Sequence, residues 1–330
     1  MIKVNFCDFW PGFGTHNLFL KFLEQHFNVS TDGRPDYLFY SVYGRDHLRY
    51  DAPVKILYTG ENLVPDFNLC DYALGFHYLE FGDRYMRFPL YAYYQWYYNR
   101  LLSNDVNKEQ APLTDEYLVK RKFCNFVYSN NVNSDPVRDS FFHQLNKYRK
   151  VDSGGRHLNN IGSPVRDKLA FIKDYKFTIA FENSSVPGYT TEKLLEPVIA
   201  RSLPIYYGNP LVHLDFEPGS FLRLESRNDI ERVIEEIITL DRDDEKYFEM
   251  LNKNKFRPEN RTDIWEEKLR LFLGNIFDQP VNEALRRPVH GFNKFYVEEL
   301  KLQSQLLSGR KRRNSLKNMI KKNISRVIHR

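Results

Sequence analysis

The feature that most constrains this chain is the alternation of short apolar segments with amphipathic ones in its second half. Apolar runs such as KFTIAFEN and LPIYYG are typical of buried strands, and a stretch with helical periodicity separates them. Strands that alternate with helices in this way form a parallel sheet with helices on its faces. We therefore predict a doubly wound α/β domain in the second half.

The first half shows a related pattern. The segment IKVNFCDFW predicts a strand, HNLFLKFLEQHF predicts an amphipathic helix, and four further strand-like runs follow. Apolar density falls and charge rises before FCNFVYSN, which predicts a link between two domains. We predict an α/β domain over residues 1–118, a second over 119–285, a helical region over 286–308 that crosses back to the first, and a separate tail over 309–330.

The cysteines and the start of the chain bear on its location. Cys7, Cys70 and Cys124 are odd in number and far apart, so they form neither a disulfide framework nor a zinc-binding pattern. The first residues read directly as a strand without a signal peptide, and no run of about 18 apolar residues occurs. We expect a cytoplasmic protein, peripheral on the cytosolic face of a membrane.

The net charge of +5 comes from the tail. The segment from Gly309 onward contains nine Lys or Arg and no acid, which leaves 39 basic against 43 acidic residues before it. A mildly acidic body argues against a globular surface that binds nucleic acid. Apolar residues recur in the tail at helical spacing: Leu316, Met319, Ile320, Ile324, Val327 and Ile328. Such a basic amphipathic helix suits an anionic membrane surface, while a disordered arm or an RNA-binding arm are the alternatives.

Two cations stand where a loop becomes a helix. Lys193 falls in the first turn after GYTTE, and Arg138 takes a similar place after SDPV. Helix N-termini favour anions, so two such cations in one sheet suit a nucleoside diphosphate. The alternatives are ordinary ion pairs, of Lys193 with Glu196 and of Arg138 with Asp135 or Asp139.

Two carboxylates are candidates for the chemistry. Glu192 precedes Lys193 and could contact hydroxyls of a ribose or another sugar, or only stabilise the start of its helix. Glu61 follows the apolar strand VKILY, and a carboxylate at a strand end that faces a cleft is a candidate general base. Glu61 could equally be a solvated loop residue, and Glu80 and Asp83 compete for the same role.

A metal site is not expected. The triplet DRD at residues 241–243 resembles a divalent-metal motif, but it lies between two predicted helices and is better explained as a helix cap. The histidines show no ligand spacing, and no Gly-Lys-Ser/Thr phosphate loop is present.

Longer motifs carry a family resemblance. The block FTIAFENSSVPGYTTEKL, followed by ARSLPIYYGNP, closely resembles the donor-binding signature of the α-1,3/4-fucosyltransferases, which use GDP-fucose. Matches in family order include DFWPGF, ILYTGEN, DYALGF and FCNFVYSN. The chain looks most like the bacterial members.

The resemblance implies a GT-B glycosyltransferase with two Rossmann-like domains that face a cleft. The first domain would bind the acceptor and the second GDP-fucose. Arg138 and Lys193 would contact the diphosphate, and Asn183, Tyr189 and Glu192 would surround the nucleotide sugar. Glu61 would be the general base, with Glu192 as a second catalytic carboxylate. No cofactor or metal would be required, although divalent ions could still stimulate the enzyme.

The resulting hypothesis is an inverting α-1,3-fucosyltransferase. It would transfer fucose to the GlcNAc of N-acetyllactosamine-type glycans, giving a Lewis x-type product in surface polysaccharide or lipopolysaccharide. Its partners would be GDP-fucose, this glycan and an anionic membrane surface bound through residues 309–330, without nucleic acid. The alternatives are an α-1,4 or dual-specificity enzyme, a GT-B transferase with another donor, and a basic-tailed nucleic-acid-binding or scaffold protein.

Overall fold

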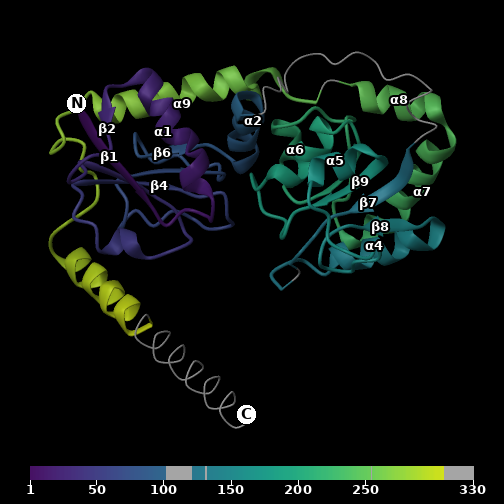
Figure 1. The fold of residues 1–330 in the computed structure, drawn as a ribbon, viewed down its shortest axis with the longest axis horizontal. Coiled ribbons are helices and arrows are strands. Elements are labelled where there is room, and N and C mark those ends of the chain that lie inside the picture. Colours follow the sequence, from purple (N-terminus) through teal and green to yellow (C-terminus); the bar gives the residue numbers. More distant parts are fainter. Residues whose placement is uncertain (102–120, 131, 254, 308–330) are drawn as a thin grey trace, which may run out of the picture. The chain divides into compact units, whose positions relative to one another are not determined.

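The computed structural model describes residues 1–330 except 102–120, 131, 254 and 308–330. It contains two sheets, drawn in purple to blue for the first and in teal to green for the second (Figure 1). The prediction of two α/β domains, each built on a parallel sheet, is confirmed. The predicted link falls largely within residues 102–120, which lie outside the described residues. The predicted tail, residues 309–330, also lies outside them.

The first sheet has six strands in the order β2-β1-β3-β4-β5-β6. The pairs from β2 to β5 are parallel, and their registers place Val4 opposite Tyr37 and Ile56 opposite Tyr72. The strands are β1 (Ile2–Cys7), β2 (Val29–Ser30), β3 (Tyr37–Tyr40), β4 (Val54–Tyr58), β5 (Tyr72–Gly75) and β6 (Tyr85–Arg87). From β1 the chain first adds β2 on one side and then adds β3 to β6 on the other side. The carboxyl ends of β1 and β3 are therefore the topological switch point of this sheet.

The second sheet has five strands in the order β11-β10-β9-β7-β8, and all four neighbouring pairs are parallel. The strands are β7 (Lys122–Phe126), β8 (Val151–Ser153), β9 (Tyr175–Phe181), β10 (Leu203–Tyr207) and β11 (Leu222–Arg223). Every residue of β9 is buried, as expected for a central parallel strand covered on both faces. Here the order reverses between β7 and β9, so the loops after these two strands begin side by side.

The α-helices in the described part of the chain are α1 (Leu18–His26), α2 (Leu90–Leu101), α4 (Val137–Tyr148), α5 (Lys168–Lys173), α6 (Glu192–Ile199), α7 (Ile230–Arg242), α8 (Asp244–Asn252) and α9 (Thr262–Phe277), with a further helix over 292–307. Short 3-10 helices span Phe13–His16, Asp46–Leu48, Val212–Leu214, Arg227–Asp229 and Pro258–Asn260. The sequence analysis missed α2 and α9. The tyrosine-rich segment of α2 lacks a clear polar face, because it is largely buried.

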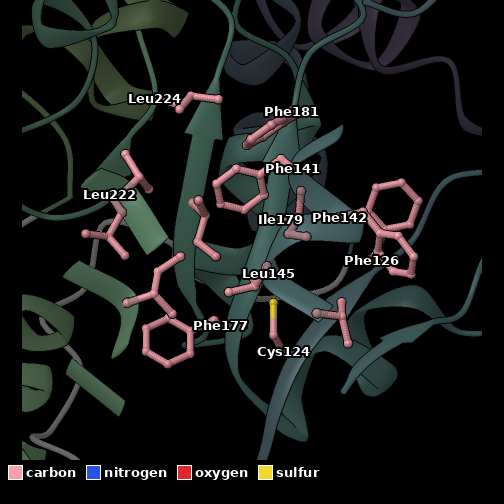
Figure 2. Packing of buried hydrophobic residues seen from close by; sticks show 14 of the residues in the cluster. Cys124, Phe126, Phe141, Phe142, Leu145, Phe177, Ile179, Phe181, Leu222 and Leu224 are labelled. Atoms are coloured by element: carbon pink, nitrogen blue, oxygen red, sulfur yellow. The ribbon is translucent and has the colours of Figure 1, made fainter. Parts of the chain in front are cut away.

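The core of the second sheet lies between its strands and the helices α4, α7 and α8. The alternate β9 residues Phe177, Ile179 and Phe181 point into this core, as the two-residue period of a strand requires. Figure 2 shows Phe141 from α4 beside Phe181, with ring centroids 5.0 Å apart. Helices α5 and α6 also contact β9, and none of their residues belongs to this cluster. Packing of this kind fixes the carboxyl end of β9, from which the candidate site is built.

The chain divides into two compact units at boundaries that differ from the predicted ones. The first unit holds Met1–Leu74, Phe81–Tyr85 and the residues from Leu273 onward, and the second holds Gly75–Glu80 and Met86–Phe272. Helix α2 therefore belongs to the second unit, although its residues precede the predicted boundary at 118. The chain returns to the first unit inside α9, at Leu273, before the predicted position at 286. The sequence pattern could not predict this point, because the alternation of strands and helices does not show where a helix passes from one unit to the other.

In the described part of the chain, no helix combines the length and the apolarity needed to cross a membrane.

Candidate active site

Helix α6 begins at the carboxyl edge of the second sheet with a network of charged side chains. Thr191 is its N-cap, and the Thr191 side chain accepts a hydrogen bond from the Lys193 amide. Glu182, the residue after β9, accepts from both the amide and the hydroxyl of Thr191 at 2.7 Å. The Glu182 side chain is 0% exposed, and these two bonds satisfy both of its oxygens. Glu182 therefore fixes the first turn of α6 against the end of β9.

Lys193 lies among three oxygen-bearing side chains. Its Nζ is 3.1 Å from Thr191 Oγ1, 3.2 Å from Glu192 Oε1 and 3.4 Å from Glu182 Oε2. The Lys193 and Glu192 side chains keep 15% and 21% of their surface exposed. Lys193 thus pairs with Glu182 and Glu192 rather than with Glu196, whose described ion pair is with Lys168.

Neighbouring charges keep both Lys193 and Glu192 ionised. Although burial lowers the pKa of Lys193, the carboxylates of Glu192 and Glu182 raise it well above its ordinary value. Burial raises the pKa of Glu192, but Lys193 and Lys168 outweigh this and bring it to about 2. For Glu182 burial dominates, and it raises the pKa of this carboxyl despite the nearby Lys193. Because Glu182 is fully buried, the partly exposed charges at the start of α6 are the Lys193 ammonium and the Glu192 carboxylate.

The loop before α6 can be formed only with glycine at position 188. Gly188 has φ +86°, and a Cβ there would lie 2.3 Å from the carbonyl oxygen of Phe76. The Gly188 amide donates to Asn209 Oδ1 at 2.7 Å. Arg87 donates to the carbonyls of Phe76 and Gly188, and its guanidinium also pairs with Asp215 at 2.7 Å. Arg87 thus ties the loop to a buried carboxylate.

Arg138 is 1% exposed and holds the end of β9. Its Nη2 donates to the carbonyls of Phe181 and Glu182 and to Asn183 Oδ1 at 2.8 Å, and its guanidinium lies over the Tyr128 ring. Among the described residues it pairs with neither Asp135 nor Asp139, and its Nε has no acceptor. This leaves a buried donor at the junction of the loops after β7 and β9.

The remaining residues predicted around a nucleotide sugar lie in the same region. Asn183 is half-buried beside Arg138, and its carbonyl accepts from the Asp135 amide at 2.8 Å. Tyr189 is buried, with its ring centroid 4.9 Å from that of Phe76. The second unit therefore brings together Arg138, Asn183, Tyr189, Glu192 and Lys193 between the end of β9 and the start of α6.

Glu61 lies in the first unit, just after β4. Its Oε1 accepts from the Tyr43 hydroxyl at 2.5 Å, and its amide donates to Thr59 Oγ1 at 3.1 Å. Tyr43 follows β3, so the pair joins the loops of two neighbouring strands. Of the two competing acids, Asp83 pairs with Arg286 at 2.7 Å, while Glu80 is exposed.

Asp8 supports this arrangement from the end of β1. It accepts from the amides of Asp46 and His47 at 3.0 and 2.8 Å and contacts the His47 ring at 2.7 Å. Burial raises the pKa of Asp8, but the hydrogen bonds from His47 lower it below its ordinary value. A Cβ on Gly44 would lie 2.1 Å from Asp8 Oδ1, so a side chain at this position would displace the carboxylate. Asp8 therefore shapes the loop that carries Tyr43.

Sequence reasoning missed the residues that position the candidates. Glu182 ends an apolar strand as Glu61 does, and that signal could have identified it. The sequence carries no signal for Tyr43, Arg87 or Asp215. Tyr43 contacts Glu61, and Arg87 contacts Asp215, only in the folded chain. The DRD triplet is a cap as predicted, since Asp243 accepts from the Lys246 amide at the start of α8. No cluster of possible metal ligands occurs in the part of the chain that the structure describes.

Comparisons with known proteins identify the family of the chain. Residues 4–94 match the family described as the α-(1,3)-fucosyltransferase FucT N-terminal domain, and residues 118–275 match the C-terminal part of glycosyltransferase family 10 (fucosyltransferase). The chain belongs to glycosyltransferase family 10. The predicted family membership is therefore confirmed.

Relatives and solved structures support the assignment. An α-(1,3)-fucosyltransferase FucT of Helicobacter pylori is 34% identical over 269 residues, which cover 70% of this chain and 55% of that protein. The chain thus spans about half the length of this relative. A crystal structure of an α1,3-fucosyltransferase matches with a TM-score of 0.71 and 27% identity, covering 85% of this chain and 91% of that one. One solved with GDP-fucose matches with a TM-score of 0.63 and 27% identity, covering 82% and 90%. The predicted GT-B fold class is confirmed.

Proposed function

We propose that this family 10 protein is an inverting α-1,3-fucosyltransferase that uses GDP-β-L-fucose. The observation that carries the proposal is the ion pair of Lys193 with Glu192 at the N-terminus of α6. The buried Glu182 fixes this turn by accepting a hydrogen bond from the Thr191 amide. The family and the similar crystal structure of an α1,3-fucosyltransferase with GDP-fucose favour this donor. A helix N-terminus with an added ammonium suits the diphosphate of that donor.

The donor-side residues would act as follows. Lys193 would offset the negative charge that develops on GDP as it leaves. Arg138 Nε is a buried donor without an acceptor in the described part of the chain, and a phosphate oxygen would supply one. Glu192, ionised and partly exposed, would accept from hydroxyls of the ribose or fucose, or stabilise positive charge on the sugar ring. Asn183 and Tyr189 would shape the surroundings of the nucleotide sugar.

Glu61 would act as the general base. It would take the proton of the acceptor hydroxyl while that oxygen bonds to the anomeric carbon of fucose. The bond from this carbon to the β-phosphate oxygen would break, and GDP would leave with the bonding electrons. Attack from the face opposite the leaving group converts a β-linked donor into an α-linked product.

For the acceptor, we propose the GlcNAc of N-acetyllactosamine-type glycans in surface polysaccharide or lipopolysaccharide, with a Lewis x-type product. The Helicobacter pylori relative is an α-(1,3)-fucosyltransferase, which favours the 1,3 linkage. We also propose that residues 309–330 bring the enzyme to the cytosolic face of an anionic membrane, where lipid-linked acceptors are made. No metal or other cofactor is assigned a step in this scheme.

The experiment that tests the function follows GDP release from GDP-fucose with and without N-acetyllactosamine, in EDTA, for the wild type and Glu61→Gln. Acceptor-dependent release that survives EDTA and is lost in the variant supports the proposal. GDP-fucose binding is measured separately by thermal stabilisation of the protein. Binding without release on N-acetyllactosamine would overturn the acceptor, and the type 1 isomer would then test a 1,4 linkage. Failure to bind GDP-fucose would overturn the donor.

A further inference from the structure

A cavity of about 400 Å³ lies within the first unit, at the end of β4 opposite to Glu61. Its walls come from two segments far apart in the chain, residues 47–69 and residues 287–301. Lys55, the second residue of β4, lies on one side, and Arg287 lies on the other. A volume of this size is in the usual range for small-molecule sites.

The charged residues that line the cavity are mostly cations. They are Lys55, Arg287, Lys294 and Lys301, against the carboxylates of Asp51 and Glu298. Asp51 is in addition paired with Arg34 at 2.6 Å. No ion pair involves any of the three lysines within the described part of the chain. These three lysines therefore offer positive charge that no carboxylate of the described residues pairs with.

Two of these cations are held in place by the fold. The buried Asp71 pairs with the Arg287 guanidinium, and it accepts from the amides of Arg287 and Lys55 at 2.8 and 2.7 Å. The Lys55 ammonium donates to the His47 carbonyl at 2.5 Å. Burial lowers the pKa of Lys55, the neighbouring Arg287 and Lys301 add to this effect, and the resulting pKa is about 8. An anion in the cavity would relieve this repulsion between like charges.

The chemistry of the walls indicates the kind of ligand. A guanidinium and several ammonium groups together match the oxygens of a phosphate group. Leu48, Leu69 and Val297 add apolar surface to the same cavity, which suits the carbon part of a larger molecule. We propose that this cavity is a binding site for a phosphate ester, with the phosphate on Lys55, Arg287 and Lys301 and the organic part against the apolar wall.

The phosphate ester could be a soluble metabolite or a lipid headgroup. The helix over 292–307 carries Lys294 and Lys301 and continues in sequence into the basic residues 309–330. The two sources share the same recognition chemistry, and they can be separated experimentally. This site does not depend on the proposed transferase activity, since Glu61, Glu192 and Lys193 are not part of its lining.

The test uses the full chain and a readout that reports position. Hydrogen exchange is measured with sn-glycerol 3-phosphate, and separately with phosphatidylcholine vesicles that contain phosphatidic acid. The variants are Lys301→Gln and Lys294→Gln, which change exposed residues and should fold, and Lys21→Gln on α1, also exposed, is the matched control.

The expected result is slower exchange within residues 287–301, with binding weakened about tenfold by Lys301→Gln and unchanged by Lys21→Gln. Protection by glycerol 3-phosphate would support a soluble ligand, and protection only by the vesicles would support a lipid headgroup. Two results would overturn the proposal: no protection of this segment by either probe, or protection and affinity that are the same in all three variants. Vesicle binding through residues 309–330 alone would give equal protection and affinity in all three variants.

Discussion

The Tyr43 hydroxyl donates a hydrogen bond of 2.5 Å to Oε1 of Glu61, joining the loops that follow β3 and β4. A short bond of this kind restricts the orientation of the carboxylate. A general base must point its free oxygen at the proton it removes, so orientation affects the rate directly. Tyr43 is therefore a positioning residue for the proposed base.

We expect Tyr43→Phe to lower kcat about tenfold and to leave the KM for GDP-fucose unchanged, because Glu61 keeps its charge and loses only its orientation. Glu61→Gln should lower kcat by about 10² to 10⁴-fold. Steady-state kinetics with GDP-fucose and N-acetyllactosamine measure both. The matched control is Tyr296→Phe, which removes an exposed hydroxyl bond to Asp66 in the same unit. A Tyr43 variant with a raised donor KM and a normal kcat would contradict the positioning role.

Gly188→Ala should abolish or strongly weaken GDP binding. The added Cβ would meet the Phe76 carbonyl at 2.3 Å, so the loop before α6 must move. The positive φ adds about 1 kcal/mol of strain by itself. Gly291→Ala separates the two effects, since Gly291 has φ +66° and open space around it. Thermal stabilisation by GDP is the measurement, and a retained GDP response in Gly188→Ala would show that the loop does not shape the nucleotide site.

How far the sequence predicts this site depends on what kind of signal each residue carries. Glu61, Asn183 and Lys193 follow strands or begin a helix, and in a parallel sheet those positions converge at one edge, so periodicity and turn signals locate them. The partners of these residues are not visible in the same way. Tyr43 and Glu61 are 18 positions apart, and nothing local in the sequence links them.

The same reasoning explains why one expected ion pair is not formed. Arg138 was expected to pair with an acid if it did not bind a ligand, but its partners are backbone carbonyls at the end of β9, which have no sequence signature. The Asp135 side chain instead accepts from the Val137 amide at the start of α4, at 3.0 Å.

Glu192 should make the stability of the protein depend on pH in acid. Its pKa falls from 4.5 to about 2 in the folded state. A lowered folded-state pKa means that the ionised form stabilises the fold above about pH 4.5, and that this stabilisation is lost as the pH falls toward 2. Wild type should therefore exceed Glu192→Gln in the free energy of unfolding by about 2 kcal/mol at pH 7, with a smaller difference at pH 3.

Urea unfolding of both proteins at the two pH values provides the measurement. Glu249→Gln is the matched control, because that side chain is exposed and its ion pair with Lys253 is 3.8 Å long. Its effect should be small at both pH values. A difference between wild type and Glu192→Gln that stays constant from pH 7 to pH 3 would show that the carboxylate does not contribute through its charge.

The Arg87–Asp215 pair should be worth more to stability than any exposed ion pair of the same unit. Asp215 is buried, and it accepts from Arg87 at 2.8 and 2.7 Å and from the Tyr91 hydroxyl at 3.0 Å. Burial lowers the pKa of Arg87, but Asp215 raises it above its ordinary value, so the guanidinium stays charged. Removing one partner leaves the other charge buried and unpaired, which costs about 3–5 kcal/mol.

Arg87→Gln and Asp215→Asn should each lower the free energy of unfolding by about this amount, and the double variant should cost much less than their sum. Arg87→Gln should also weaken GDP binding, because Arg87 donates to the carbonyls of Phe76 and Gly188 in the loop before α6. The exposed pair of Arg270 and Glu267 is the matched control, and Arg270→Gln should cost less than about 1 kcal/mol. Urea unfolding and GDP titration measure the two effects. Additive losses in the double variant would mean that the residues stabilise the unit separately, and that Arg87 supports the loop without help from Asp215.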